Sequence, residues 1–149
     1  MKKILLIEDD EFKFNSIRNL VLQFNSKFYI DGARSLVEAV DAINSSEYDL
    51  ILIDMSIPSH PIVSGEGSPI SLLTGGLEVI FELNYLHRSD RCVIITQYPE
   101  IEICDKFYSL EESVDAIREN YDCVVSSCIE YKEDSTAWKE LLNNELTNI

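Results

Sequence analysis

The chain has 149 residues and a mass of 17.0 kDa, the usual size of one folded domain, and its 46% hydrophobic and 26% charged residues exclude collagen-like and wholly disordered chains. The 12 Lys and Arg against 27 Asp and Glu give a formal charge of -15, which repels nucleic acid and anionic lipid. No segment has the roughly 20 apolar residues of a membrane span. We therefore expect a single cytoplasmic domain over residues 1–149, with no nucleic-acid or membrane partner.

Five apolar segments bounded by turn residues are predicted strands, and segments with helical spacing follow each of them. In chain order the predicted strands are Lys3 to Ile7, Lys27 to Ile30, Asp49 to Ile53, Arg91 to Thr96 and Cys123 to Tyr131. Apolar residues three and four apart predict helices around Phe14 to Phe24, Leu36 to Ile43, Leu77 to Leu86, Leu110 to Ile117 and Trp138 to Leu146. Ser109 and Glu112 form a predicted capping box before the fourth helix, and Asp134 or Ser135 is expected to cap the fifth.

This alternation predicts an α/β fold of the (βα)5 kind. The first, third and fourth strands are apolar throughout, as in a parallel sheet covered on both faces. Right-handed crossovers make such a sheet doubly wound, and its functional residues lie beyond the carboxyl ends of the strands.

Two connections are longer than this pattern needs, Met55 to about Gly75 and Gln97 to Tyr108. Unstructured loops of more than about 12 residues are usually functional or mobile. The first could cover the site as a lid or bind a partner, or it could be a disordered insertion. His60, in this loop, and His87 are both expected at the surface. The cysteines lack C-x-x-C spacing and are expected to be reduced and structural; they are Cys92, Cys104, Cys123 and Cys128.

Acidic residues follow the first and third predicted strands. Glu8, Asp9 and Asp10 come directly after the first, and Asp54 ends the third, so the fold brings their carboxylates to one rim of the sheet. Crowded carboxylates repel unless a cation neutralises them, and Mg2+ prefers a few carboxylates completed by water and a phosphate oxygen. We expect Glu8, Asp9 and Asp54 to hold Mg2+ and Asp10 to cap the first helix. Thr96 ends the fourth strand and places a hydroxyl at the same rim.

Taken together, four segments resemble the receiver domain of two-component response regulators. They are Ile4 to Asp10, Tyr48 to Pro58, Gly75 to Glu78 and Val93 to Thr96. The resemblance implies a flavodoxin-like, five-stranded parallel sheet in the order 2-1-3-4-5. It also implies that Asp54 accepts a phosphoryl group, that Asp9 ligates Mg2+ directly and Glu8 through water, and that the backbone carbonyl of Ser56 is a further ligand. Thr96 matches the hydroxyl that contacts the phosphoryl oxygen and signals its presence.

The end of the fifth predicted strand departs from this family. Receivers keep a Lys there that pairs with the phosphoryl oxygen, and counting back from Trp138 puts Tyr131 at that position and Lys132 one residue on. A shift of one residue reverses the direction of a side chain in a strand. Either Lys132 reaches the site through a bulge or the phosphoryl anchor is missing. We expect the first, with Tyr131 packed against the last helix or toward Thr96.

The predicted function is that of a single-domain receiver, because no output domain follows Ile149. A histidine kinase or phosphotransfer protein would phosphorylate Asp54 in a Mg2+-dependent reaction, and the signal would pass to a downstream protein. One alternative is a degenerate receiver that binds a protein without phosphorylation; the missing Lys favours it and the retained acids argue against it. A phosphohydrolase is disfavoured because haloacid-dehalogenase-type enzymes normally carry an Asp where Ser56 stands. The domain is thus expected to signal rather than to act as an enzyme, beyond catalysing its own phosphorylation and dephosphorylation.

Overall fold

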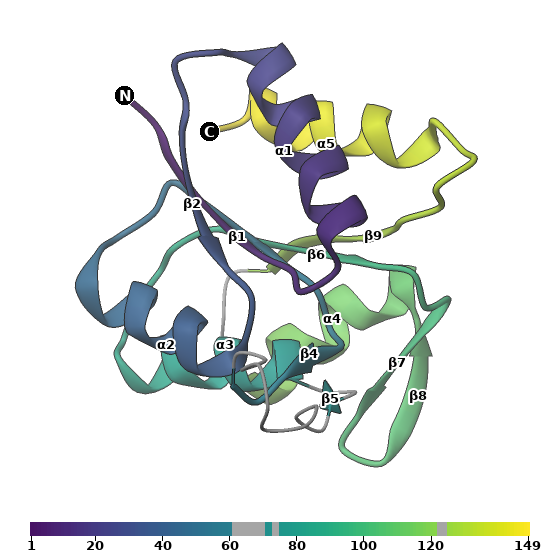
Figure 1. Cartoon of the computed structure of the whole chain (residues 1–149). Coiled ribbons are helices and arrows are strands. Elements are labelled where there is room, and N and C mark those ends of the chain that lie inside the picture. The colour runs from purple at the N-terminus through teal and green to yellow at the C-terminus, as the bar shows by residue number, and fades with distance from the viewer. Residues whose placement is uncertain (61–70, 73–74, 122–124) are drawn as a thin grey trace, which may run out of the picture.

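A central parallel sheet organises the molecule in the computed structural model, which describes residues 1–60, 71–72, 75–121 and 125–149 (Figure 1). Its strands run in the order β2-β1-β3-β6-β9. They are β1 (Lys3–Ile7), β2 (Tyr29–Ala33), β3 (Leu50–Ile53), β6 (Cys92–Thr96) and β9 (Val125–Glu130). Because β6 and β9 are the fourth and fifth strands of this sheet along the chain, the predicted order 2-1-3-4-5 and the doubly wound α/β fold are confirmed.

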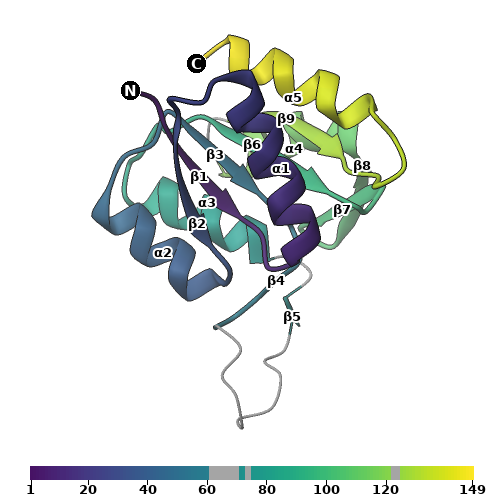
Figure 2. The ribbon, with the colours of Figure 1, turned by 45° about the horizontal axis from the view of Figure 1, so that its top comes forward.

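Five helices cover the two faces of the sheet. They are α1 (Glu11–Phe24), α2 (Leu36–Ser45), α3 (Gly75–Tyr85), α4 (Leu110–Tyr121) and α5 (Ala137–Thr147). Figure 2 shows α1 and α5 side by side over one face, with α2, α3 and α4 over the other. Among the described residues, no helix has the length and apolar character needed to span a bilayer.

The inner strands β1, β3 and β6 are almost wholly apolar because both faces of the sheet are buried there. Leu50 and Leu52 pack among the side chains of α1 and α5, whereas Ile51 and Ile53 pack among those of α2, α3 and α4. This alternation follows from the two-residue period of a strand, and it explains why β3 shows no polar residue. The prediction that the first, third and fourth strands lie in a parallel sheet covered on both faces is therefore confirmed.

The helix starts differ in how well they were predicted. Asp10 is the N-cap of α1, and its Oδ1 accepts from the Lys13 N–H at 2.8 Å, as expected. Ser109 accepts from the Glu112 N–H at 3.3 Å at the start of α4, the predicted capping contact. The N-cap position of α5 is Thr136, which makes no side-chain capping bond, whereas the predicted Ser135 accepts from the Ala137 N–H at 3.2 Å through its Oγ. The prediction is therefore displaced by one residue in position, but the expected side-chain contact is present.

The segment 97–108 is largely a β-hairpin rather than the open loop that its length indicated. Strands β7 (Glu100–Ile103) and β8 (Lys106–Ser109) pair antiparallel, and β7 alternates exposed Glu with buried Ile. The two turn residues, Cys104 and Asp105, have φ of 50° and 65°, the left-handed pair of a tight hairpin turn. The sequence Asn-Gly is typical of this turn, so the sequence Cys-Asp did not indicate it.

The long connection after β3 is described only at its two ends. Strands β4 (Ile57–Pro58) and β5 (Ser71–Leu72) pair antiparallel. His60 is exposed, as is His87, in agreement with the prediction for both. Most of the loop that was a candidate lid, residues 61–70 and 73–74, and also Cys123 lie outside the described residues. The second strand begins at Tyr29 rather than at Lys27, because it is preceded by a turn in which the Phe28 N–H donates to the Asn25 carbonyl.

An ion pair between Arg88 and Asp90 links the loops at the amino ends of the strands, at the opposite end of the sheet from the acidic residues. Arg88 makes two hydrogen bonds of 2.7 Å to the Asp90 carboxylate and a third of 2.7 Å to the Ser46 carbonyl. The Tyr48 N–H donates to the same carboxylate at 2.7 Å. Burial alone would raise the pKa of Asp90, but the bonds from Arg88 and Tyr48 hold it below its usual value.

Candidate functional site

Three predicted carboxylates meet at the carboxyl ends of β1 and β3. These strands pair with Ile7 opposite Ile53, so the residues that follow are neighbours. Oxygen atoms of Glu8, Asp9 and Asp54 all lie within 4.8 Å of one another. Glu8 and Asp54 are 1% and 2% exposed, and Asp9 is exposed. The structure therefore brings these acids together, and hard oxygen donors of this kind fit Mg2+.

The backbone holds Asp54 rigidly at the sheet edge. Its N–H donates to the Ile7 carbonyl at 3.0 Å, and the Gly76 N–H donates to the Met55 carbonyl at 3.0 Å. A Cβ at position 76 would lie 2.7 Å from the Asp54 carbonyl oxygen, so α3 can approach this closely only because residue 76 is glycine. Ser56 follows in the same segment, which places its backbone two residues beyond Asp54.

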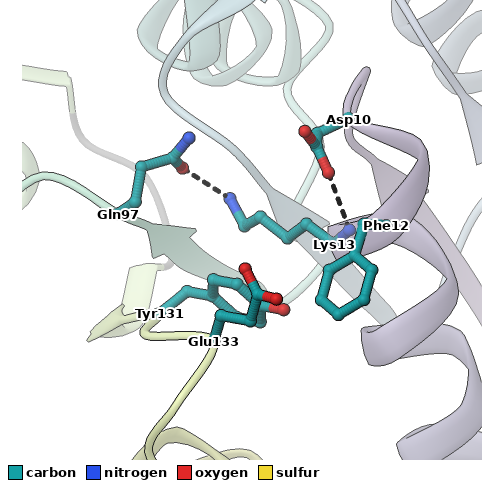
Figure 3. A pocket seen from close by; sticks show the side chains of 6 residues that line it. All are labelled: Asp10, Phe12, Lys13, Gln97, Tyr131 and Glu133. Atoms are coloured by element: carbon teal, nitrogen blue, oxygen red, sulfur yellow. Dashed lines mark hydrogen bonds between the residues drawn. The ribbon is translucent and has the colours of Figure 1, made fainter.

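A buried ammonium that the sequence analysis did not identify lies among these acids. The side chain of Lys13 is 3% exposed, and its Nζ lies 2.6 Å from Glu8 Oε2 and 3.0 Å from Asp54 Oδ1. The same Nζ donates to the Ile95 carbonyl at 2.9 Å and to Gln97 Oε1 at 3.1 Å. In Figure 3 Lys13 extends from α1 toward Gln97 beside the ring of Tyr131.

The local sequence explains how a helix residue reaches the sheet edge. Asp10 caps α1, so Lys13 stands in its first turn, where side chains tilt toward the helix N-terminus and the strand ends. Lys13 also lies four residues before the buried Ile17 and eight before Val21, on the inward face. A cation at an inward helical position is the signal that could have identified it.

The charges of the cluster favour the binding of a divalent cation. Burial raises the pKa of both Glu8 and Asp54, and the nearby Lys13 ammonium opposes that rise only in part. Ionisation of all three acids beside one ammonium would leave a net charge of -2, which one Mg2+ ion would neutralise. Glu8 Oε2 lies 2.6 Å from Nζ of Lys13, the same ammonium that contacts Asp54.

The remaining predicted residues lie on β6 and after β9. Thr96 is fully buried at the end of β6, and its Oγ1 accepts from the Tyr98 N–H at 3.3 Å. The Tyr131 N–H donates to the Thr96 carbonyl at 2.8 Å, and its ring lies 4.9 Å from that of Trp138 on α5. The predicted packing of Tyr131 against the last helix is confirmed.

Lys132 does not turn inward, so that expectation is wrong. Its side chain is 64% exposed, and its Nζ lies 3.1 Å from Glu130 Oε1. The bulge expected beside Lys132 is not found at the end of β9; the register with β6 shifts near the start of the strand instead, between Cys92 and Val93. From there the strand keeps its period, so Ile129 and Tyr131 both face α1 and α5 and Lys132 emerges into solvent.

Comparison with known proteins supplies the family. No protein-family model matches the chain. The Detocs response regulatory protein DtcB of Vibrio alginolyticus is 36% identical over 140 residues, which span 92% of this chain and 94% of that protein. The chain belongs to the response regulators.

Solved response regulator structures share the fold of this response regulator. A CheY-like receiver domain from Methanospirillum hungatei superposes with a TM-score of 0.62 at 20% identity, over 99% of this chain and 95% of that one. TrrA from Thermotoga maritima, solved in complex with Mg2+ and BeF, gives 0.57 at 21% identity, over 98% and 99%. Response regulators are phosphoacceptors in signalling rather than enzymes, and they work with histidine kinases or phosphotransfer proteins.

Proposed function

We propose that this response regulator accepts one phosphoryl group on Asp54 in a Mg2+-dependent reaction and signals by contact with a downstream protein. The observation that carries the proposal is the cluster at the strand ends, where a buried Asp54 lies beside Glu8, Asp9 and a lysine ammonium. Phosphoryl transfer needs mainly alignment and charge neutralisation, and this cluster offers both.

The metal ligands follow from the donor set. Asp9, Asp54 and the backbone carbonyl of Ser56 would hold Mg2+ directly, and Glu8 would act through water. Bound Mg2+ would neutralise charge on the transferred phosphoryl oxygens. Asp9 is exposed and therefore accessible to an entering hydrated ion, whereas the buried Asp54 is held in place by its backbone contacts.

In the transfer step, a carboxylate oxygen of Asp54 attacks the phosphorus atom of the donor. A new P–O bond forms while the P–N bond of a phosphohistidine breaks, and the imidazole leaves with the electron pair and takes a proton from solvent. Lys13 holds the Oδ1 of Asp54, which fixes the carboxylate plane for this attack. The Thr96 hydroxyl would donate to a phosphoryl oxygen, because it ends the neighbouring strand at the same rim.

Signalling by protein contact is supported by charge. The formal charge of -15 disfavours nucleic acid as the immediate target. A downstream protein partner is therefore the recipient that we propose, after phosphorylation by a histidine kinase or a phosphotransfer protein. The alternative of a phosphorylation-independent binding module depended on the absence of a lysine from the site, and the buried Lys13 removes that reason.

Intact mass after incubation with acetyl phosphate or phosphoramidate tests the proposal. The parent with Mg2+ should gain the mass of one phosphoryl group, and chelation of the metal should prevent the gain. Asp54→Asn should abolish it, whereas the matched variant Asp10→Asn should retain it, because asparagine also caps a helix. A parent that gains no mass with any donor, or an Asp54→Asn variant that still gains it, would contradict the proposal.

A further inference from the structure

We propose that Lys13, in the first turn of α1, is the cation that holds the phosphoryl group on Asp54, and that Tyr131 fills the place a strand-borne lysine would take. This inference rests on the proposed phosphorylation of Asp54. The phosphoryl contact then comes from α1, near the N-terminus, and not from the end of β9, near the C-terminus.

The first support is position. Nζ of Lys13 lies 3.0 Å from Asp54 Oδ1, in hydrogen-bond contact with the carboxylate that is to be phosphorylated. A phosphoryl group bonded to this carboxylate carries its own oxygens into the same volume. The lysine ammonium has three donors on a flexible stem, so it can pass from a carboxylate oxygen to a phosphoryl oxygen without a backbone shift.

The second support is charge. Phosphorylation replaces the single negative charge of Asp54 with about two on the phosphoryl group, inside a cluster where Glu8 and Asp54 are almost fully buried. Charge-assisted hydrogen bonds to phosphate oxygens are strong under such conditions. With a divalent ion present, the cluster still carries excess negative charge, so a second cation stabilises the phosphorylated state.

The third support is that Lys132, the other candidate cation, lies outside the site. Lys132 pairs with Glu130 and is largely in solvent. Among the ion pairs that join described residues, those of Asp54 and Glu8 come from Lys13. The helix lysine is therefore the described ammonium that is already at the site.

The fourth support is the side chain that occupies the end of β9. The Tyr131 ring is buried, packs on Trp138 and lies 5.6 Å from Nζ of Lys13, a cation–π distance. Both side chains line one pocket of about 270 Å3 beside the acidic cluster (Figure 3). A lysine at position 131 would therefore point its stem toward the volume that the Lys13 ammonium occupies.

This geometry predicts that a lysine introduced at position 131, at the end of β9, can replace the ammonium of Lys13 on α1. Lys13→Ala should slow phosphorylation of Asp54 by phosphoramidate and Mg2+ at least about tenfold, the loss expected for one charged hydrogen bond. Lys132→Ala, the matched control, should stay within about twofold of the parent because its pair is exposed. Adding Tyr131→Lys to Lys13→Ala should recover several-fold of the lost rate, which a purely structural role of Lys13 would not produce.

Rates come from intact mass against time, and circular dichroism melting shows which variants are folded. If Lys13→Ala does not fold, Lys13→Met with Tyr131→Lys keeps one ammonium and is compared with Lys13→Met with Tyr131→Met, which keeps none. Equal rates in a folded Lys13→Ala variant and the parent, or equal rates in the two double variants, overturn the inference and leave the proposed function intact. A parent that is not phosphorylated at all overturns both.

Discussion

Replacing Lys13 with methionine should strongly destabilise the fold, and Mg2+ should restore much of the loss. The change keeps the unbranched stem and removes the ammonium, so Glu8 and Asp54 remain buried at 1% and 2% exposure without their ion-pair partner. Removal of one partner of a buried pair costs about 3–5 kcal/mol. Total stabilities are about 5–15 kcal/mol, so the loss is a large part of the whole.

The dependence on metal is the sharper part of this prediction. Without the ammonium the three acids carry one more uncompensated negative charge, so Mg2+ should bind the variant more tightly and stabilise it more than the parent. Lys132→Met is the matched control. Its exposed pair with Glu130 is screened by water, so the expected cost is about 0–1 kcal/mol and independent of Mg2+.

Urea unfolding followed by circular dichroism, with and without Mg2+, measures both quantities. A loss below about 1 kcal/mol for Lys13→Met would show that Glu8 and Asp54 are not held by this ammonium. An equal Mg2+ effect on variant and parent would refute the reasoning that the ammonium and the metal neutralise one set of charges.

Three further predictions concern other residues. Asp9→Asn should weaken Mg2+ binding in an NMR titration more than any other single substitution at the site, and equal binding by the parent would remove Asp9 from the ligands. Gly76→Ala should cost about 1–3 kcal/mol in urea unfolding, because its Cβ would lie 2.7 Å from the Asp54 carbonyl. Asp90 has a folded pKa below its unfolded one, so its contribution is present above the unfolded pKa and is lost as pH falls through the folded pKa. Asp90→Asn should therefore flatten the acid side of the stability profile, and an unchanged profile would show that the Arg88 pair is not the cause.

Much of the fold was predictable because parallel strands that are buried on both faces have an easily recognised sequence pattern. Strands such as β3 are apolar at every position, and turn residues bound them. The β7–β8 hairpin escaped prediction because its turn uses Cys104 and Asp105 in left-handed conformations that asparagine and glycine usually adopt. The alternation of Glu and Ile in β7 was the available signal.

The acidic half of the site was predictable and its cationic half was not. Glu8, Asp9 and Asp54 follow strand ends, and topology alone brings strand ends together. Lys13 was overlooked because a charged residue in the first turn of a helix is usually solvated. Its burial depends on the tilt of a side chain across the sheet edge, which spacing indicates only when the inward face of the helix is traced back to its first turn.

The position of Lys13 on α1 also affects how such chains are recognised. The residues Glu8 to Lys13 form one unbroken stretch of six that supplies two acids and the ammonium, and Asp54 joins them from a single further strand. If Lys13 binds the phosphoryl group as proposed, the end of β9 needs no charge and can hold an aromatic residue against Trp138. A homologue search that demands a lysine near the C-terminus would reject this architecture as inactive. A search for an acidic pair followed four residues later by a lysine would retain it.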